Sequence, residues 1–189
     1  GAYSDDLVSY EIGNSTSESF FNNSLLSTTA NINTLWRNSY SQIYAANSVI
    51  EGVNNSSNLS ESVKNQIRGE ALFIRAFLHF HLMSVFGDIP YIKTTDYRAN
   101  STVTRLSTEL VFQELISDLE TAMNGVNTTY IDSGRTRPNK AAIQAFLARV
   151  YLYHGDYAEA SNMASAVLNA TSVYQLETNL DMEFLKQSR

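Results

Sequence analysis

The stretch RAFLHFHLMSVFGDIPYI, residues 75–92, has the apolar spacing of a packed helix and then ends at Gly-Asp-Ile-Pro. Together with the residues before it, this spacing predicts a helix that begins after Ser60, a good N-cap, and runs to about Phe86. Gly87 and Pro90 stop the helix, because proline cannot continue it. One face carries Val63, Ile67, Ala71, Ile74, Leu78, Leu82 and Val85, and a second carries Phe73, Phe77, Phe80 and Met83. A helix that is apolar on two sides is expected to be buried between neighbours.

Two histidines interrupt this apolar run, His79 and His81. Their spacing places them about 200° apart around the helix axis, whereas two histidines that bind one metal ion from a helix are four positions apart. We therefore expect no metal site here and interpret both as packing groups that hold helices together. Arg75 and Arg149 lie on mostly apolar helices, so each needs a carboxylate or carbonyl partner if it is buried. Asn47 is expected to form hydrogen bonds between helices.

Helical periodicity extends along most of the remaining chain. Apolar residues at steps of three and four predict a helix over residues 33–53. A loop is expected over 88–105, followed by a helix that Ser107 caps and that ends near Asn124. Pro138 can open another helix through Tyr153, and a last helix is expected over 157–169.

Two short motifs occur twice, at almost the same separation. Ala76-Phe77-Leu78 recurs as Ala145-Phe146-Leu147, an offset of 69, and Phe86-Gly87-Asp88-Ile89 recurs as His154-Gly155-Asp156-Tyr157, an offset of 68. Both offsets are about twice the roughly 34-residue period of tetratricopeptide repeats. The second copy also has the small and large residues of that repeat, at Leu147, Ala148, Tyr151, Gly155, Tyr157, Ala160 and Ala164.

The sequence thus predicts an all-α fold of tetratricopeptide-like helical hairpins. We expect an irregular N-terminal segment over residues 1–32, a helical domain over 33–171, and the start of a continuation over 172–189.

Composition and charge exclude several classes of function. The net charge is −6 and no block of Lys and Arg is present, which argues against binding to nucleic acid or to anionic lipid. The absence of cysteine excludes zinc–thiolate sites, thiol catalysis and disulfides. The sequence contains no run of 18 uncharged apolar residues, so it predicts no transmembrane helix.

No catalytic or cofactor-binding motif stands out. The sequence has no nucleophile elbow, no phosphate-binding glycine loop and no zincin helix. The carboxylate pairs Asp5/Asp6 and Asp156/Glu159 lack a plausible partner, and the second pair is expected to charge a helix N-terminus. We predict that the protein is not an enzyme and binds no cofactor or metal.

The residues best suited to recognition combine tyrosine with Asn, Asp or Arg, since aromatic faces stack on sugar rings and planar polar groups bind hydroxyls. Two such clusters are the early Tyr3, Asp5, Asp6 and Tyr10, and, after the long helix, Tyr91, Tyr97, Arg98 and Asn100.

Several segments resemble the SusD/RagB family of nutrient-binding lipoproteins from the Bacteroidetes outer membrane. They are LWRNSYSQIYAANSVIEGV (35–53), IRGEALFIRAFLHFHLMSVFGDIPYI (67–92), TELVFQELISDLETA (108–122), RTRPNKAAIQAFLARVYLYHGDYAEASNMASAVL (135–168) and YQLE (174–177). The resemblance implies a SusD-like α-α superhelix with tetratricopeptide repeats. It also implies a protein several hundred residues long, with an anchoring cysteine before residue 1 and further chain after residue 189.

By the same resemblance, the protein is expected on the cell surface, held at the outer membrane by a lipid anchor beside a SusC-like TonB-dependent transporter. It would capture oligosaccharides, or peptides as in some members, for import in polysaccharide utilisation. The repeat helices would form the scaffold and contact the transporter, and loops would supply the ligand contacts.

Two other functions remain open from the sequence. A helical-repeat adaptor that binds only proteins would show an exposed, continuous helix groove. A glycan-processing enzyme would need two carboxylates about 5–10 Å apart beside a cleft. A surface glycan-binding protein would instead show an aromatic platform with polar groups next to it.

Overall fold

The computed structural model describes residues 21, 22, 24, 26, 30–176, 178 and 179. The chain divides into two compact units, residues 1–42 and 43–189, and each is described by itself. Among the described residues, strand pairing is limited to an isolated antiparallel bridge between Ile89 and Leu106. The predicted all-α fold is confirmed.

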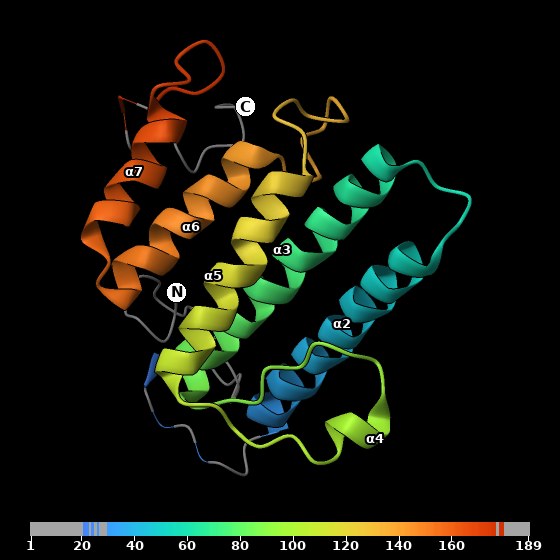
Figure 1. The fold of residues 1–189 in the computed structure, drawn as a ribbon. Coiled ribbons are helices and arrows are strands. Elements are labelled where there is room, and N and C mark those ends of the chain that lie inside the picture. The colour runs from blue at the N-terminus through green and yellow to red at the C-terminus, as the bar shows by residue number, and fades with distance from the viewer. Residues whose placement is uncertain (1–20, 23, 25, 27–29, 177, 180–189) are drawn as a thin grey trace. The chain divides into compact units, whose positions relative to one another are not determined.

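Helices follow one another along the described part of the chain, as Figure 1 shows. They are α2 (Ala30–Asn55), α3 (Glu61–Phe86), α4 (Tyr97–Asn100), α5 (Thr108–Gly125), α6 (Lys140–His154) and α7 (Tyr157–Leu168). Two details differ from the sequence prediction. The short helix α4 interrupts the expected loop over 88–105, and α6 begins after Asn139 and not at Pro138.

Short polar side chains and two glycines fix the helix ends. Ser60, Ser107 and Asn139 each accept a hydrogen bond from the backbone N–H three residues further on. An N-cap of this kind contributes about 1 kcal/mol. At the other end of α3 and of α6, Gly87 and Gly155 have φ angles of +71° and +100°, which favour glycine. The two equivalent positions of the repeated motif thus both place a glycine at positive φ, with ψ −125° at Gly87 and the left-handed helical conformation at Gly155.

Helices α3, α5, α6 and α7 pack in series within the unit 43–189, each against the next (Figure 1). Phe146 of α6 fixes the position of α6 on α3. Its ring centroid lies 5.7 Å from that of Phe73, 5.2 Å from that of Phe77 and 5.3 Å from that of Phe80. On α5, Glu120 accepts a hydrogen bond of 3.0 Å from the hydroxyl of Tyr151 in α6. Helix α6 therefore contacts both helices of the preceding hairpin.

The prediction that both apolar faces of α3 are buried is wrong. Its buried residues are Gln66, Gly69, Ala71, Leu72, Arg75, Ala76, His79, Phe80, Leu82 and Met83. Its exposed large apolar residues are Val63, Ile74, Phe77 and Val85. The buried face of α3 contains both polar and apolar residues. Arg75 and His79 can be buried there because their polar atoms have hydrogen-bond partners. His81 is exposed, so its predicted packing between helices is wrong; its ring lies 4.4 Å from that of Phe77 on the same helix.

Helices α6 and α7 carry two charged groups that the sequence singled out. Arg149 is exposed and therefore needs no buried partner. Asp156 stands at the N-cap of α7, but its carboxylate bonds His154 at 2.7 Å and caps no backbone N–H. Glu159 lies in the first turn of α7, as expected for a charge at a helix N-terminus.

Over the part of the chain that the structure describes, none of the helices is both long and apolar enough to span a bilayer.

Candidate functional site

The connection between α3 and α5, residues 87–107, carries the short helix α4 (Figure 1). Its two ends are joined, because the Leu106 N–H donates a 2.9 Å hydrogen bond to the Ile89 carbonyl. Next to this pair, the Asp88 carboxylate accepts a 3.1 Å bond from the Thr108 N–H, the first residue of α5. These two hydrogen bonds hold the ends of the connection together, so residues 90–105 form a loop whose base is fixed.

Helix α4 presents an aromatic ring beside a guanidinium. Asp96 caps the helix by accepting a 2.9 Å hydrogen bond from the Arg98 N–H. The Tyr97 side chain is 74% exposed. Arg98 Nε donates to the Tyr97 hydroxyl at 3.2 Å, and the guanidinium carbon lies 5.8 Å from the centroid of the ring. The structure thus brings together two of the residues that the sequence predicted for ligand binding.

The other two members of this predicted cluster hold the loop. The Asn100 amide donates a 2.8 Å hydrogen bond to the Thr94 carbonyl, and this bond holds the segment that leads into α4. Tyr91 is only 6% exposed, and its hydroxyl donates to Asp118 Oδ2 at 2.7 Å. Interpreting Tyr91 as a ligand contact is therefore wrong, because its ring and hydroxyl belong to the core.

Glu51 of α2 fixes the chain directly before α4. Its carboxylate accepts hydrogen bonds from the Thr95 N–H at 2.8 Å, from the Thr95 hydroxyl at 2.5 Å and from the Thr94 hydroxyl at 3.0 Å. These bonds, the Thr95 hydroxyl first, lower the pKa of Glu51. The carboxylate is therefore ionised at neutral pH, and three donors from two consecutive residues hold it.

His79 and Asn47 hold the base of the loop. His79 is fully buried, its Nδ1 lies 2.8 Å from the Arg75 carbonyl, and its Nε2 accepts a 3.1 Å hydrogen bond from the Ile92 N–H. That second bond places the proton of the neutral ring on Nδ1, which donates to Arg75. Burial lowers the pKa of His79 to about 4, so the ring is neutral at physiological pH. Asn47 donates to the Ile92 carbonyl at 3.1 Å.

Arg75 connects this base to α5. Its Nε and Nη2 donate to the two carboxylate oxygens of Asp118, both at 2.7 Å, and its Nη1 donates to Asn47 Oδ1 at 2.9 Å. Both members of the ion pair are almost fully buried. Burial alone lowers the pKa of Arg75, but its hydrogen bonds to Asp118 and the negative charge of that carboxylate outweigh burial, and the pKa is raised. Burial also raises the pKa of Tyr91 well above its ordinary value. The predicted structural pairing of Arg75 and the bonding of Asn47 between elements are confirmed.

The early cluster of Tyr3, Asp5, Asp6 and Tyr10 lies outside the described residues. Within the described ones, no group of three or more His, Cys, Asp or Glu side chains is arranged to hold a metal ion. The loop presents the exposed phenol ring of Tyr97 and the guanidinium of Arg98 on a backbone that hydrogen bonds hold in place. Such a pair can bind by stacking and hydrogen bonding.

Sequence reasoning missed Glu51, because a glutamate on an amphipathic helix is usually a solvated residue. A signal was nevertheless present: Glu51 follows Asn47 by four residues, which places two polar groups on one helix face. Both bond the same loop.

A family profile described as starch-binding associating with outer membrane, of the SusD-like type, matches residues 3–152. A SusD-like protein from Formosa agariphila is 31% identical over 156 residues, which are 82% of this chain and 30% of that protein. A SusD superfamily protein from Parabacteroides distasonis superposes with a TM-score of 0.78 at 24% identity, over 90% of this chain and 38% of that one.

A SusD-like carbohydrate-binding protein from Bacteroides fragilis superposes with a TM-score of 0.70 at 26% identity, over 77% of this chain and 29% of that one. The chain therefore spans about a third of the length of the relatives that it matches.

Proposed function

Because the chain belongs to the SusD-like family, we propose that it is a non-catalytic protein that captures an oligosaccharide, with the ring of Tyr97 as a stacking platform. One observation carries this proposal: a 74% exposed tyrosine stands on a loop whose backbone is anchored to neighbouring helices. A tyrosine ring that is already exposed on a fixed backbone can stack on an incoming sugar without first leaving the core.

The chemistry of Tyr97 and Arg98 suits a sugar. The apolar face of a pyranose stacks on an aromatic ring, and a guanidinium donates to neighbouring hydroxyls. One bond ties Arg98 Nε to the Tyr97 hydroxyl, which orients the guanidinium beside the ring. Asp5, Asp6, Tyr3 and Tyr10 remain proposed contacts from the early segment. Binding should be modest and depend weakly on salt, because a neutral sugar releases no counterions.

The carbohydrate-binding protein from Bacteroides fragilis supports this ligand class, since it shares the fold at 26% identity. Family membership also supports a place at the outer membrane. We include in the proposal a lipid anchor on the cell surface and a SusC-like TonB-dependent transporter as the partner that receives the ligand. Because the chain spans about a third of its relatives, these are proposals about the whole protein.

A protein-binding adaptor is the second candidate function, and one feature favours it: an open apolar groove between α6 and α7. The two functions differ in the residues that they need. A glycan ligand depends on Tyr97, whereas a protein ligand in the groove would depend on Tyr153 and Tyr157.

Calorimetric titration of the chain with α-glucans, β-glucans, mannans, fructans and host-type glycans tests the proposal. We expect heat of binding with one class, and affinity at least about fivefold weaker in Tyr97→Ala, since stacking on one ring is worth about 1 kcal/mol. Tyr157→Ala is the matched control, because it removes an equally exposed tyrosine from α7. Unchanged affinity in Tyr97→Ala with a loss in a double Tyr3→Ala, Tyr10→Ala variant would move the site to the early cluster. A folded protein that responds to none of the glycans would contradict binding by this chain.

A further inference from the structure

His154, the last residue of α6, lies between two carboxylates. Its Nδ1 is 2.7 Å from Asp156 Oδ2, in the turn that leads to α7, and its Nε2 is 3.0 Å from Glu109 Oε2, in the first turn of α5. The ring centroid of Phe112, also on α5, lies 4.9 Å from that of the imidazole. One side chain therefore joins the end of α6, the start of α7 and the start of α5.

This geometry favours the protonated ring. A neutral imidazole has one N–H, so one of its nitrogens would turn a lone pair toward a carboxylate, whereas the imidazolium donates to both. The charged groups that face the ring are Glu109 from α5 and Asp156 from the turn, while Glu159, in the first turn of α7, accepts a 3.4 Å bond from Asn162. The bond to Asp156 is the largest effect on the pKa of His154 and raises it. Loss of the second proton removes one of the two bonds.

Asp156 has a second group of donors within its own helix. It stands at the N-cap of α7 but forms no capping bond. The backbone N–H groups of Ala158 and Glu159, which an N-cap carboxylate would bond, have no acceptor among the described residues. Aspartate is one of the best capping residues, and its charge suits a helix N-terminus. The Asp156 carboxylate therefore has two alternative partners, the imidazolium and the first turn of α7.

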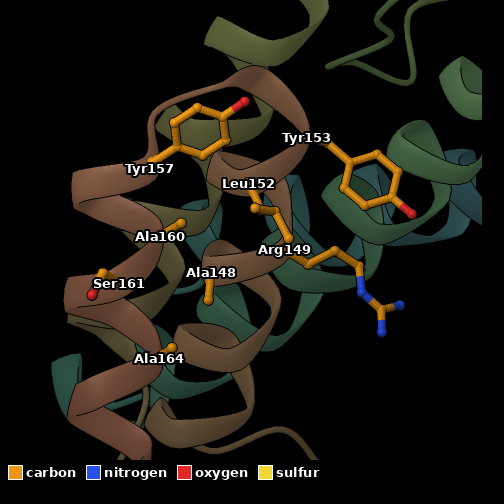
Figure 2. A pocket seen from close by; sticks show the side chains of 8 residues that line it. All are labelled: Ala148, Arg149, Leu152, Tyr153, Tyr157, Ala160, Ser161 and Ala164. Atoms are coloured by element: carbon orange, nitrogen blue, oxygen red, sulfur yellow. The ribbon is translucent and has the colours of Figure 1, made fainter.

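We propose that His154 is a proton-operated switch at the start of α7. While the ring is protonated, its bonds to Asp156 and Glu109 tie the turn between α6 and α7 to α5. When the ring loses its proton, Asp156 turns to the free N–H groups and caps α7. Tyr157 follows Asp156 directly and stands at the start of α7 beside the groove between α6 and α7, whose volume is about 420 Å³ (Figure 2). The switch therefore changes one edge of that groove as the pH rises through the neutral range.

Nuclear magnetic resonance between about pH 5 and about pH 9 tests the proposal. The ring ¹⁵N shifts report which nitrogens of His154 carry a proton, and carbon-detected spectra follow the backbone of Ala158 and Glu159 even where amide exchange is fast. We expect a doubly protonated ring at the acid end, and backbone shifts that change with the same midpoint as the ring. His154→Phe keeps a ring against Phe112 but has no donor, so it should show the high-pH backbone shifts throughout.

Variants of the two carboxylates separate the ion pairs from the switch. Glu109→Gln and Asp156→Ser should each lower the proton affinity of His154 at least about twofold, as expected for exposed ion pairs. Asp156→Ser should also make the backbone shifts of α7 independent of pH, because serine caps the helix in either state of the ring. Glu61→Gln is the matched control, since it removes a first-turn carboxylate of α3 that pairs with Lys64 and should leave His154 unchanged.

Three results would overturn the proposal. Backbone shifts of Ala158 and Glu159 that stay constant while His154 titrates would reduce the cluster to an exposed ion pair without a switch. The same pH-dependent shifts in His154→Phe would assign them to another group. A ring with a single proton at about pH 5 would show that His154 does not donate to both carboxylates.

Discussion

Acidification is expected to destabilise the protein through His79. The ring is fully buried, with Nδ1 at the Arg75 carbonyl and Nε2 at the Ile92 N–H. The neutral ring satisfies both partners, whereas a protonated ring would point a second N–H at the Ile92 donor. Burial accordingly lowers its pKa in the folded protein to about 4, while the unfolded chain retains the ordinary value of 6.5.

The sign and size of the effect follow from these two values. A lowered folded pKa means that the unfolded chain binds the proton more tightly, so stability is full above pH 6.5 and falls as the pH drops toward 4. Between about pH 7.5 and about pH 5, the loss amounts to about 2 kcal/mol. For a chain of this length, that corresponds to a fall of about 4–8 °C in the melting temperature. His154 acts in the opposite direction over a higher range, because its bond to Asp156 raises its pKa and its contribution is lost as the pH rises.

Urea unfolding, followed by circular dichroism at a series of pH values, measures this loss. His79→Gln is the comparison, since glutamine does not titrate; its unfolding free energy should fall by about 2 kcal/mol less than that of the unchanged protein. The chain has three histidines, so each can be followed by NMR. A His79 resonance that titrates near pH 6.5 in the folded protein, or equal pH dependence in the two proteins, would refute the reasoning.

Two further predictions concern the packing of α3 on α5. Asp118→Asn removes the carboxylate that neutralises buried Arg75 and should lower the unfolding free energy in urea by about 3–5 kcal/mol. Glu114→Gln, at the partly exposed ion pair with Lys93, should change it by less than about 1 kcal/mol. A loss below about 1 kcal/mol in Asp118→Asn would mean that the pair is not buried. Gly69→Ala should lower the same free energy by about 1–3 kcal/mol. The new Cβ would lie 2.7 Å from Cγ1 of Val126, the C-cap residue of α5. Gly52→Ala, where nothing lies within 4 Å, should be neutral or stabilising, and equal stability of the two alanine variants would contradict the close helix crossing.

The helices could be predicted from the sequence because their signals are local. Ser60 and Ser107 cap helices where the apolar period begins, and Gly87 ends one where the period stops. The inward face of α3 could not be predicted from hydrophobicity alone. Whether Arg75 points into the core depends on Asp118, 43 residues further along the chain, and no local pattern links the two.

The candidate site could be predicted only in part. Tyrosine and arginine side by side at Tyr97 and Arg98 were enough to suggest a binding loop, and the structure places them together. The same composition suggested Tyr91, which is buried, because a list of residue types carries no information about burial. Glu51 was missed because its partners are 43 and 44 residues away and include a backbone N–H.

The polar groups that interrupt the apolar pattern of α2 and α3 explain how a long connection can present a ring at a fixed place. Glu51 bonds the chain directly before α4, and His79 and Asn47 bond it at Ile92. Each bond removes conformational freedom from the loop at the time of folding, so less is lost when a ligand binds. A single stacked ring with a few hydrogen bonds can then give measurable affinity. His79, in the middle of α3, is thus more than a packing group, because it also holds the backbone that leads to Tyr97.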